Sequence, residues 1–169
     1  MDLRSIQKPL KEKYRSHPDS SRITLKAHSA QSDTPIACSV EVGQKIVDAQ
    51  AHRGVGGPGT AACSGDLLLG ALAACAQLTC QLVAAAMGVP IEQIRVDVEG
   101  EMDLRGTLGI SKDTPVGFQN IHTTFNISAP QATSEQLAAL KEKTEQYCVV
   151  MQTLAQPPAI KTRWLVSQP

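Results

Sequence analysis

The stretch Ser64-Gly-Asp-Leu-Leu-Leu-Gly-Ala-Leu-Ala-Ala-Cys-Ala-Gln-Leu-Thr-Cys-Gln-Leu-Val-Ala-Ala-Ala-Met87 decides the fold of this chain. It predicts one helix about 36 Å long, at a rise of about 1.5 Å per residue. No charged residue occurs between Asp66 and Glu92, which is also the first sign of a membrane span. The ends favour a helix of a folded domain, because Ser64 can cap the first turn and Gly88 can end the last. We therefore expect no membrane span.

This helix is apolar on nearly every face, so it must be buried nearly all round. A sheet of the same chain can cover one side. The simplest way to bury the other side is against a second copy of the chain, related by a two-fold axis. The many alanines would let two such helices approach closely, so we expect a homodimer.

Alternating apolar residues predict strands on both sides of the central helix. They lie around residues 23–27, 36–42 and 46–47 before it, and around 94–98, 121–127 and 160–166 after it. A second helix follows the capping box formed by Thr133 and Gln136 and ends at Pro157-Pro158. A short helix over Pro9–Arg15, started by Pro9, lies in an N-terminal extension of residues 1–18. The order indicates one α+β domain over residues 1–169, with antiparallel strands.

Composition excludes several classes of partner. The chain of 169 residues has 16 Lys+Arg and 16 Asp+Glu, so its formal charge is zero. A neutral chain with 3% aromatic residues does not favour nucleic acid or an anionic membrane. Its five cysteines follow no secretory leader, which indicates reduced thiols in a cytoplasm.

Two cofactor motifs fail on their context. The run Gly54-Val-Gly-Gly-Pro-Gly59 fits the dinucleotide pattern GxGxxG, but no apolar strand precedes it and no acid follows at the required distance. Cys63, Cys75 and Cys80 show no zinc spacing. We expect no cofactor and no metal.

The thiols remain as candidates for chemistry. Cys75 and Thr79 are four residues apart and share a helix face, whereas Cys80 lies about 140° around the helix from Cys75. Cys148 lies in the second helix. From the residues alone, each cysteine is more often core packing than a catalyst.

The run from Gly65 to Cys75, with Thr79 after it, resembles the central-helix motif of the OsmC/Ohr family. The segment Tyr-Cys-Val-Val around Cys148 resembles the segment of the second family cysteine. The segment Asp103–Gly109 and the glycine-rich loop before the helix resemble those of OsmC-like proteins outside the Ohr branch. The resemblance implies an antiparallel sheet wrapped around a long central helix, in an intertwined homodimer.

The resemblance also implies an activity, which is the reduction of organic hydroperoxides in oxidative-stress defence. Cys75 would be the peroxidatic cysteine and Cys148 the resolving one. The disulfide that they form would then be reduced by a dithiol, which in the Ohr branch is a lipoylated protein.

Such chemistry needs a thiolate, and a free cysteine with a pKa of about 8.5 is mostly protonated at neutral pH. The dipole of the central helix fades within its first turn, so Cys75 needs a nearby cation. The family uses an arginine held by a glutamate. Here Asp66 stands at the acid position, and either Arg53 or Arg105 is the candidate cation, with Arg53 preferred.

The chain departs from the family at two points, since Asp66 is shorter than Glu and Val149 replaces a proline after the second cysteine. The alternative hypothesis is therefore a dimer without peroxidase activity, which binds a small apolar ligand at its interface.

Overall fold

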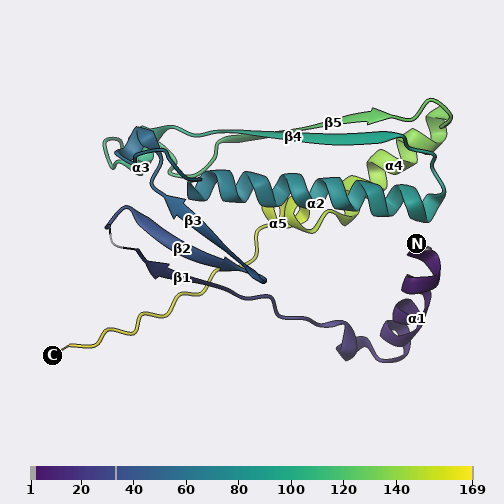
Figure 1. Cartoon of the computed structure of the whole chain (residues 1–169), viewed down its shortest axis with the longest axis horizontal. Coiled ribbons are helices and arrows are strands. Elements are labelled where there is room, and N and C mark those ends of the chain that lie inside the picture. Colours follow the sequence, from purple (N-terminus) through teal and green to yellow (C-terminus); the bar gives the residue numbers. More distant parts are fainter. Residues whose placement is uncertain (1–2, 33, 169) are drawn as a thin grey trace.

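We describe residues 3–32 and 34–168 of a computed structural model of the chain. Its centre is the helix α2, Ser64–Met87, whose bounds are those expected from the sequence (Figure 1). The N-cap is Cys63, one residue before the expected Ser64, because the Asp66 carboxylate accepts a hydrogen bond from the Cys63 N–H at 2.8 Å. Gly88 ends the helix in the left-handed conformation, at φ 71°.

Two antiparallel sheets accompany α2. The first has the order β1 (Ala27–Gln31), β2 (Ala37–Val42) and β3 (Lys45–Gln50), with Gly43 in the tight turn between β2 and β3. The second pairs β4 (Gln93–Glu101) with β5 (Asn120–Ser128) along one side of α2 (Figure 1). These elements confirm an α+β fold.

The helices after β5 pack on α2 as well. A reciprocal capping box of Thr133 and Gln136 starts α4, Ser134–Tyr147, as expected. The expected single helix is broken at Cys148, and α5 follows as Val149–Ala155. Two buried clusters form the core: one around Cys80 and Leu140, the other around Leu72, Ala76 and Cys148.

Two short helical elements, one before α2 and one between β4 and β5, were not expected from the sequence. They are a 3-10 turn, η2, over Arg53–Val55 and the one-turn helix α3, Leu104–Thr107. They contact each other near the N-terminal end of α2. Each carries one of the candidate arginines: Arg53 lies in η2 and Arg105 in α3.

The N-terminal expectations were partly wrong. Helix α1 spans Leu3–Ser16, so Pro9 lies inside the helix instead of starting it; a 3-10 turn, η1 (Pro18–Ser21), follows. The expected strand over residues 23–27 begins only at Ala27. Ala27 pairs with Val42, the last residue of β2 before its turn, so the residues before Ala27 lie beyond the end of β2 and have no partner there.

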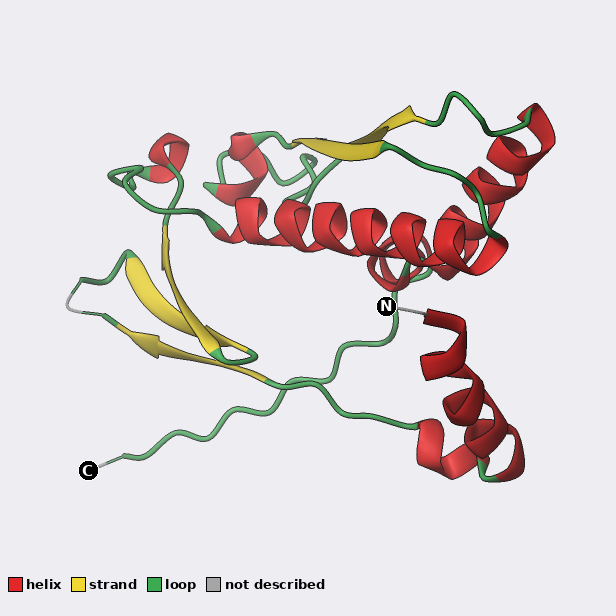
Figure 2. Cartoon of the chain, turned by 45° about the vertical axis from the view of Figure 1, so that its right-hand side comes forward, coloured by secondary structure: helices red, strands yellow, loops and turns green. Residues whose placement is uncertain are grey.

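The expected last strand over residues 160–166 is also wrong, since residues 156–168 form no strand or helix. Both views show this segment running away from the layer formed by α2, β4 and β5 (Figures 1 and 2). Its apolar side chains are exposed, Ile160 by 88% and Trp164 by 86%. A strand needs a hydrogen-bonded neighbour, and among residues 3–32 and 34–168 this segment pairs with no strand.

By length and composition alone, α2 could cross a membrane. It packs against β4, α4 and α5, as the core helix of a folded domain does. Its outer face stays uncovered in a single chain, where Leu78 is 58% and Leu82 45% exposed.

Candidate functional site

The fold brings Cys75 and Cys148 together although 73 positions separate them in sequence. Cys75 lies in the middle of α2 and is half-buried. Cys148 ends α4, starts α5 and is completely buried. Both belong to the cluster around Leu72 and Ala76, and both are free thiols.

The break between α4 and α5 explains how Cys148 reaches Cys75. Cys148 adopts an extended conformation, with φ −71° and ψ 105°, between two helical segments. Its N–H donates to the Thr144 carbonyl at 3.0 Å, and its own carbonyl accepts from the Gln152 N–H at 2.9 Å. The first N–H groups of α5 therefore have no partner within that helix and are free to bind a neighbour.

That neighbour is the sulfur of Cys75. Burial raises the pKa of Cys75, but four hydrogen bonds to its thiolate outweigh burial and lower the pKa overall. The donors are the N–H of Val150, the thiol of Cys148, the hydroxyl of Thr79 and the N–H of Val149. Thr79 Oγ1 lies 4.0 Å from the Cys75 sulfur, as expected for residues four apart on a helix.

The two cysteines have opposite shifts. Burial raises the pKa of Cys148, and the neighbouring Cys75 thiolate raises it further. Cys75 is therefore the more acidic of the two thiols and Cys148 the less acidic. A reactive thiolate beside a protonated thiol is the arrangement required for attack on an oxidant followed by disulfide formation.

Of the three expected supporting residues, Thr79 lies beside Cys75, whereas Asp66 and Arg53 lie elsewhere in the chain. Asp66 caps the start of α2, nine residues before Cys75, which corresponds to about 13 Å along the helix. The hydrogen bonds from Cys63 lower the pKa of Asp66, with a smaller contribution from His52. Arg53 donates to the Gly59 carbonyl at 3.4 Å, within the glycine-rich loop. The structure thus brings Thr79 and Cys148 to Cys75, and leaves Asp66 and Arg53 at the end of α2.

Arg105, the other candidate cation, is paired within its own segment. Its Nε lies 3.0 Å from Asp103 Oδ2, and this hydrogen bond lowers the pKa of Asp103 to about 2. Over residues 3–32 and 34–168, no arginine is among the groups that shift the pKa of Cys75.

The sequence did not predict the part played by Val149 and Val150. Their backbone N–H groups lower the pKa of Cys75, which was the effect expected of a cation. The one available signal was the pair of β-branched residues directly after Cys148, since these are weaker helix formers. Metal ligands are not gathered in the described residues, where no three His, Cys, Asp or Glu side chains come together.

The Val149 N–H gives a first testable prediction. A proline fits the first position of a helix but carries no N–H, so Val149→Pro removes one donor to Cys75 and keeps α5 compatible with its start. We expect the pH midpoint for alkylation of Cys75 by iodoacetamide to rise, because the thiolate loses a hydrogen bond. Peptide mass spectrometry across a pH series measures it. Val149→Ala, which keeps the N–H, is the control, and an equal shift in both variants would contradict this role.

Comparisons with known proteins agree with the fold. The family model for OsmC-like proteins matches residues 57–163. The solved structure of an OsmC-like protein from Mycoplasma pneumoniae is similar, with 16% identity, a TM-score of 0.66, and coverage of 80% of this chain and 89% of that one. No curated protein sequence matches the chain significantly.

Two further solved structures are of proteins named for organic hydroperoxide resistance. The one from Legionella pneumophila has 18% identity and a TM-score of 0.61, covering 80% of this chain and 92% of that one. The one from Elizabethkingia anophelis has 17% identity and a TM-score of 0.61, covering 81% and 91%. At these identities the likeness establishes the fold.

Proposed function

The chain belongs to the OsmC-like protein family, and we propose that it is a cysteine-based thiol peroxidase that reduces organic hydroperoxides. Membership of this family, with neighbours named for organic hydroperoxide resistance, supports a role in redox stress. The observation that carries the proposal is the contact between two reduced thiols whose pKa values are shifted in opposite directions.

In the proposed reaction the Cys75 thiolate attacks the terminal oxygen of the hydroperoxide. The O–O bond breaks, the alkoxide leaves and takes a proton to become an alcohol, and Cys75 becomes a sulfenic acid. The sulfur of Cys148 then attacks the Cys75 sulfur, its proton leaves with the hydroxyl as water, and a disulfide forms. An external dithiol, such as a lipoylated protein, reduces the disulfide and restores both thiols.

An assay that mixes the reduced protein with cumene hydroperoxide and a dithiol, and follows the loss of peroxide, tests this reaction directly. We expect catalytic loss of the peroxide and, after one equivalent of peroxide without the dithiol, a disulfide between Cys75 and Cys148. Mass spectrometry of the digested protein identifies that bond.

We propose that the working unit is a cytoplasmic homodimer. The support is the uncovered face of α2, where Ala71, Ala74, Leu78 and Ala85 lie exposed, together with the exposed apolar segment 156–168. Two such faces can pack on each other, and the segment can complete a strand against a second copy. Arg53 and Asp66 can then support Cys75 only from the second copy, because within one chain they lie at the end of α2.

Trp164 gives a prediction for this assembly. It is the only tryptophan and is 86% exposed in a single chain, so its fluorescence reports on whether segment 156–168 is covered. We expect blue-shifted emission, poor quenching by acrylamide, and a dimer by light scattering. A red-shifted, freely quenched Trp164 in a monomeric protein would refute the dimer. Leu165→Asp, which places a charge beside it in the same segment, should loosen the assembly and expose the tryptophan.

A second candidate function is a dimer that binds a small apolar ligand at its interface and does not use its thiols. It is favoured by one observation, namely that no arginine of the described chain acts on Cys75. A Cys75 pKa near that of a free thiol would support this candidate, and a lowered one supports the peroxidase.

A further inference from the structure

The break at Cys148 changes the partners of the backbone groups on either side of it. In an unbroken helix the carbonyl of each residue accepts a hydrogen bond from the N–H four positions later. The Thr144 carbonyl still does so, since it accepts from the Cys148 N–H at 3.0 Å. The next pair in this series would be the Glu145 carbonyl and the Val149 N–H. In the structure the Val149 N–H donates to the Cys75 sulfur instead, so the Glu145 carbonyl needs another donor.

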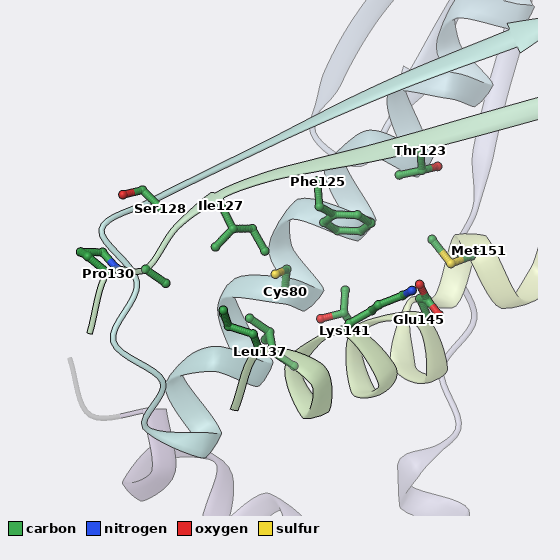
Figure 3. Close-up of a pocket in the computed structure, with 13 residues that line it drawn as sticks. Cys80, Thr123, Phe125, Ile127, Ser128, Pro130, Leu137, Lys141, Glu145 and Met151 are labelled. Atoms are coloured by element: carbon green, nitrogen blue, oxygen red, sulfur yellow. The ribbon is translucent and has the colours of Figure 1, made fainter. Parts of the chain in front are cut away.

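The side chain of Gln152 supplies that donor. Its Nε2 donates to the Glu145 carbonyl at 2.8 Å, across the break between the two helices. The backbone N–H of the same residue donates to the Cys148 carbonyl at 2.9 Å, which is the bond that starts α5. Figure 3 shows the place where the helices meet, with Glu145 on α4 and Met151 on α5 beside a cavity of about 780 Å³. Gln152 therefore links the last turn of α4 to the first turn of α5.

Two arrangements compete for the Glu145 carbonyl. In one, the Val149 N–H bonds to it, α4 continues through Cys148, and Cys75 loses a donor. In the other, which the structure shows, the Gln152 amide takes the carbonyl and the Val149 N–H stays with Cys75. Water can also bond an exposed carbonyl, but only a side chain of α5 fixes where α5 starts relative to α4 as well. The Gln152 amide thus favours the broken arrangement over the continuous helix.

We propose that Gln152 is a positioning residue of the thiol site: its side-chain amide replaces the Val149 N–H on α4, so that this N–H is free to bind the Cys75 sulfur. Gln152 is not itself among the groups that lower the pKa of Cys75, so it acts through the start of α5. The proposal concerns how the Cys75 sulfur is held, whatever oxidant or ligand that sulfur meets. It therefore goes beyond the peroxidase reaction and does not depend on it.

The first variant is Gln152→Met, which keeps the length of the side chain and the helix propensity but removes the amide donor. We expect the pH midpoint for alkylation of Cys75 by iodoacetamide to rise by about half a pH unit or more, because the Val149 N–H then bonds to Glu145 for part of the time. Peptide mass spectrometry across a pH series measures the midpoint. Gln146→Met is the matched control, at an exposed glutamine of the same junction whose side chain makes no hydrogen bond within residues 3–32 and 34–168, and it should leave the midpoint unchanged.

A double variant separates this positioning role from a general loosening of α5. In Val149→Pro the N–H is absent, so the Gln152 amide has no N–H to release. We therefore expect Gln152→Met to add no further rise to the midpoint of Val149→Pro, whereas two independent changes would add. Circular dichroism at the assay temperature checks that each variant is folded. An unchanged midpoint in Gln152→Met, an equal rise in Gln146→Met, or a fully additive rise in the double variant would each overturn the proposal.

Discussion

Replacing Cys75 with serine is expected to abolish turnover of cumene hydroperoxide, with a loss of about a thousandfold or more, since removing a nucleophile leaves only background reaction. Serine cannot form a thiolate. The N–H groups of α5 that stabilise the Cys75 thiolate would then have no anion to bind. Initial rates of peroxide loss with excess dithiol measure the effect.

Cys80→Ser is the matched control for this variant. It is the same change on the same helix, five residues further on, at a buried thiol whose pKa is raised by burial. We expect its turnover to stay within a few-fold of the wild type. Equal turnover by the wild type and Cys75→Ser would rule out the proposed reaction.

Replacing Cys148 with serine is expected to leave the first oxidation intact and to block the cycle after it. Cys75 would still attack the hydroperoxide, but its sulfenic acid would lack the adjacent sulfur needed to form the disulfide. One equivalent of alcohol should therefore appear in a burst, followed by turnover at least about a hundredfold slower.

Dimedone labelling of Cys75, read by mass spectrometry, detects the trapped sulfenic acid. Label should accumulate in Cys148→Ser and not in the wild type, where the disulfide removes the intermediate. Cys38→Ser, a change at a half-buried strand cysteine, is the control. If Cys148→Ser turned over at the wild-type rate, Cys148 would not be the resolving residue.

The sequence was most informative where structure depends on neighbouring residues in the chain. The bounds of α2 and the capping box of Thr133 both follow from local capping preferences. The alternation in β4 and β5 predicted both strands, because each has one face toward α2 and one away from it.

The errors arise where structure depends on distant partners. Residues 160–166 alternate as a strand should, yet a strand also needs a neighbouring edge to bond to, and in the described residues neither open sheet edge pairs with them. No glycine or proline marks the break at Cys148 in the sequence. The apolar stripe that runs through α4 and α5 therefore predicted a single helix. For the same reason the backbone donors to Cys75, the N–H groups of Val149 and Val150, could not be found from the residues alone.

The uncovered C-terminal segment has a consequence for how this protein folds. Both sheets of the single chain keep unpaired edges, the sheet of β4 and β5 has only two strands, and the apolar residues of segment 156–168 lie in water. Unpaired strand edges beside exposed apolar side chains favour aggregation, so an unassociated chain is prone to aggregate during folding. If the protein is the homodimer proposed above, folding and association are one bimolecular event, and we expect the melting temperature to rise with protein concentration. The Trp164 signal, followed at several concentrations, would record both steps at once.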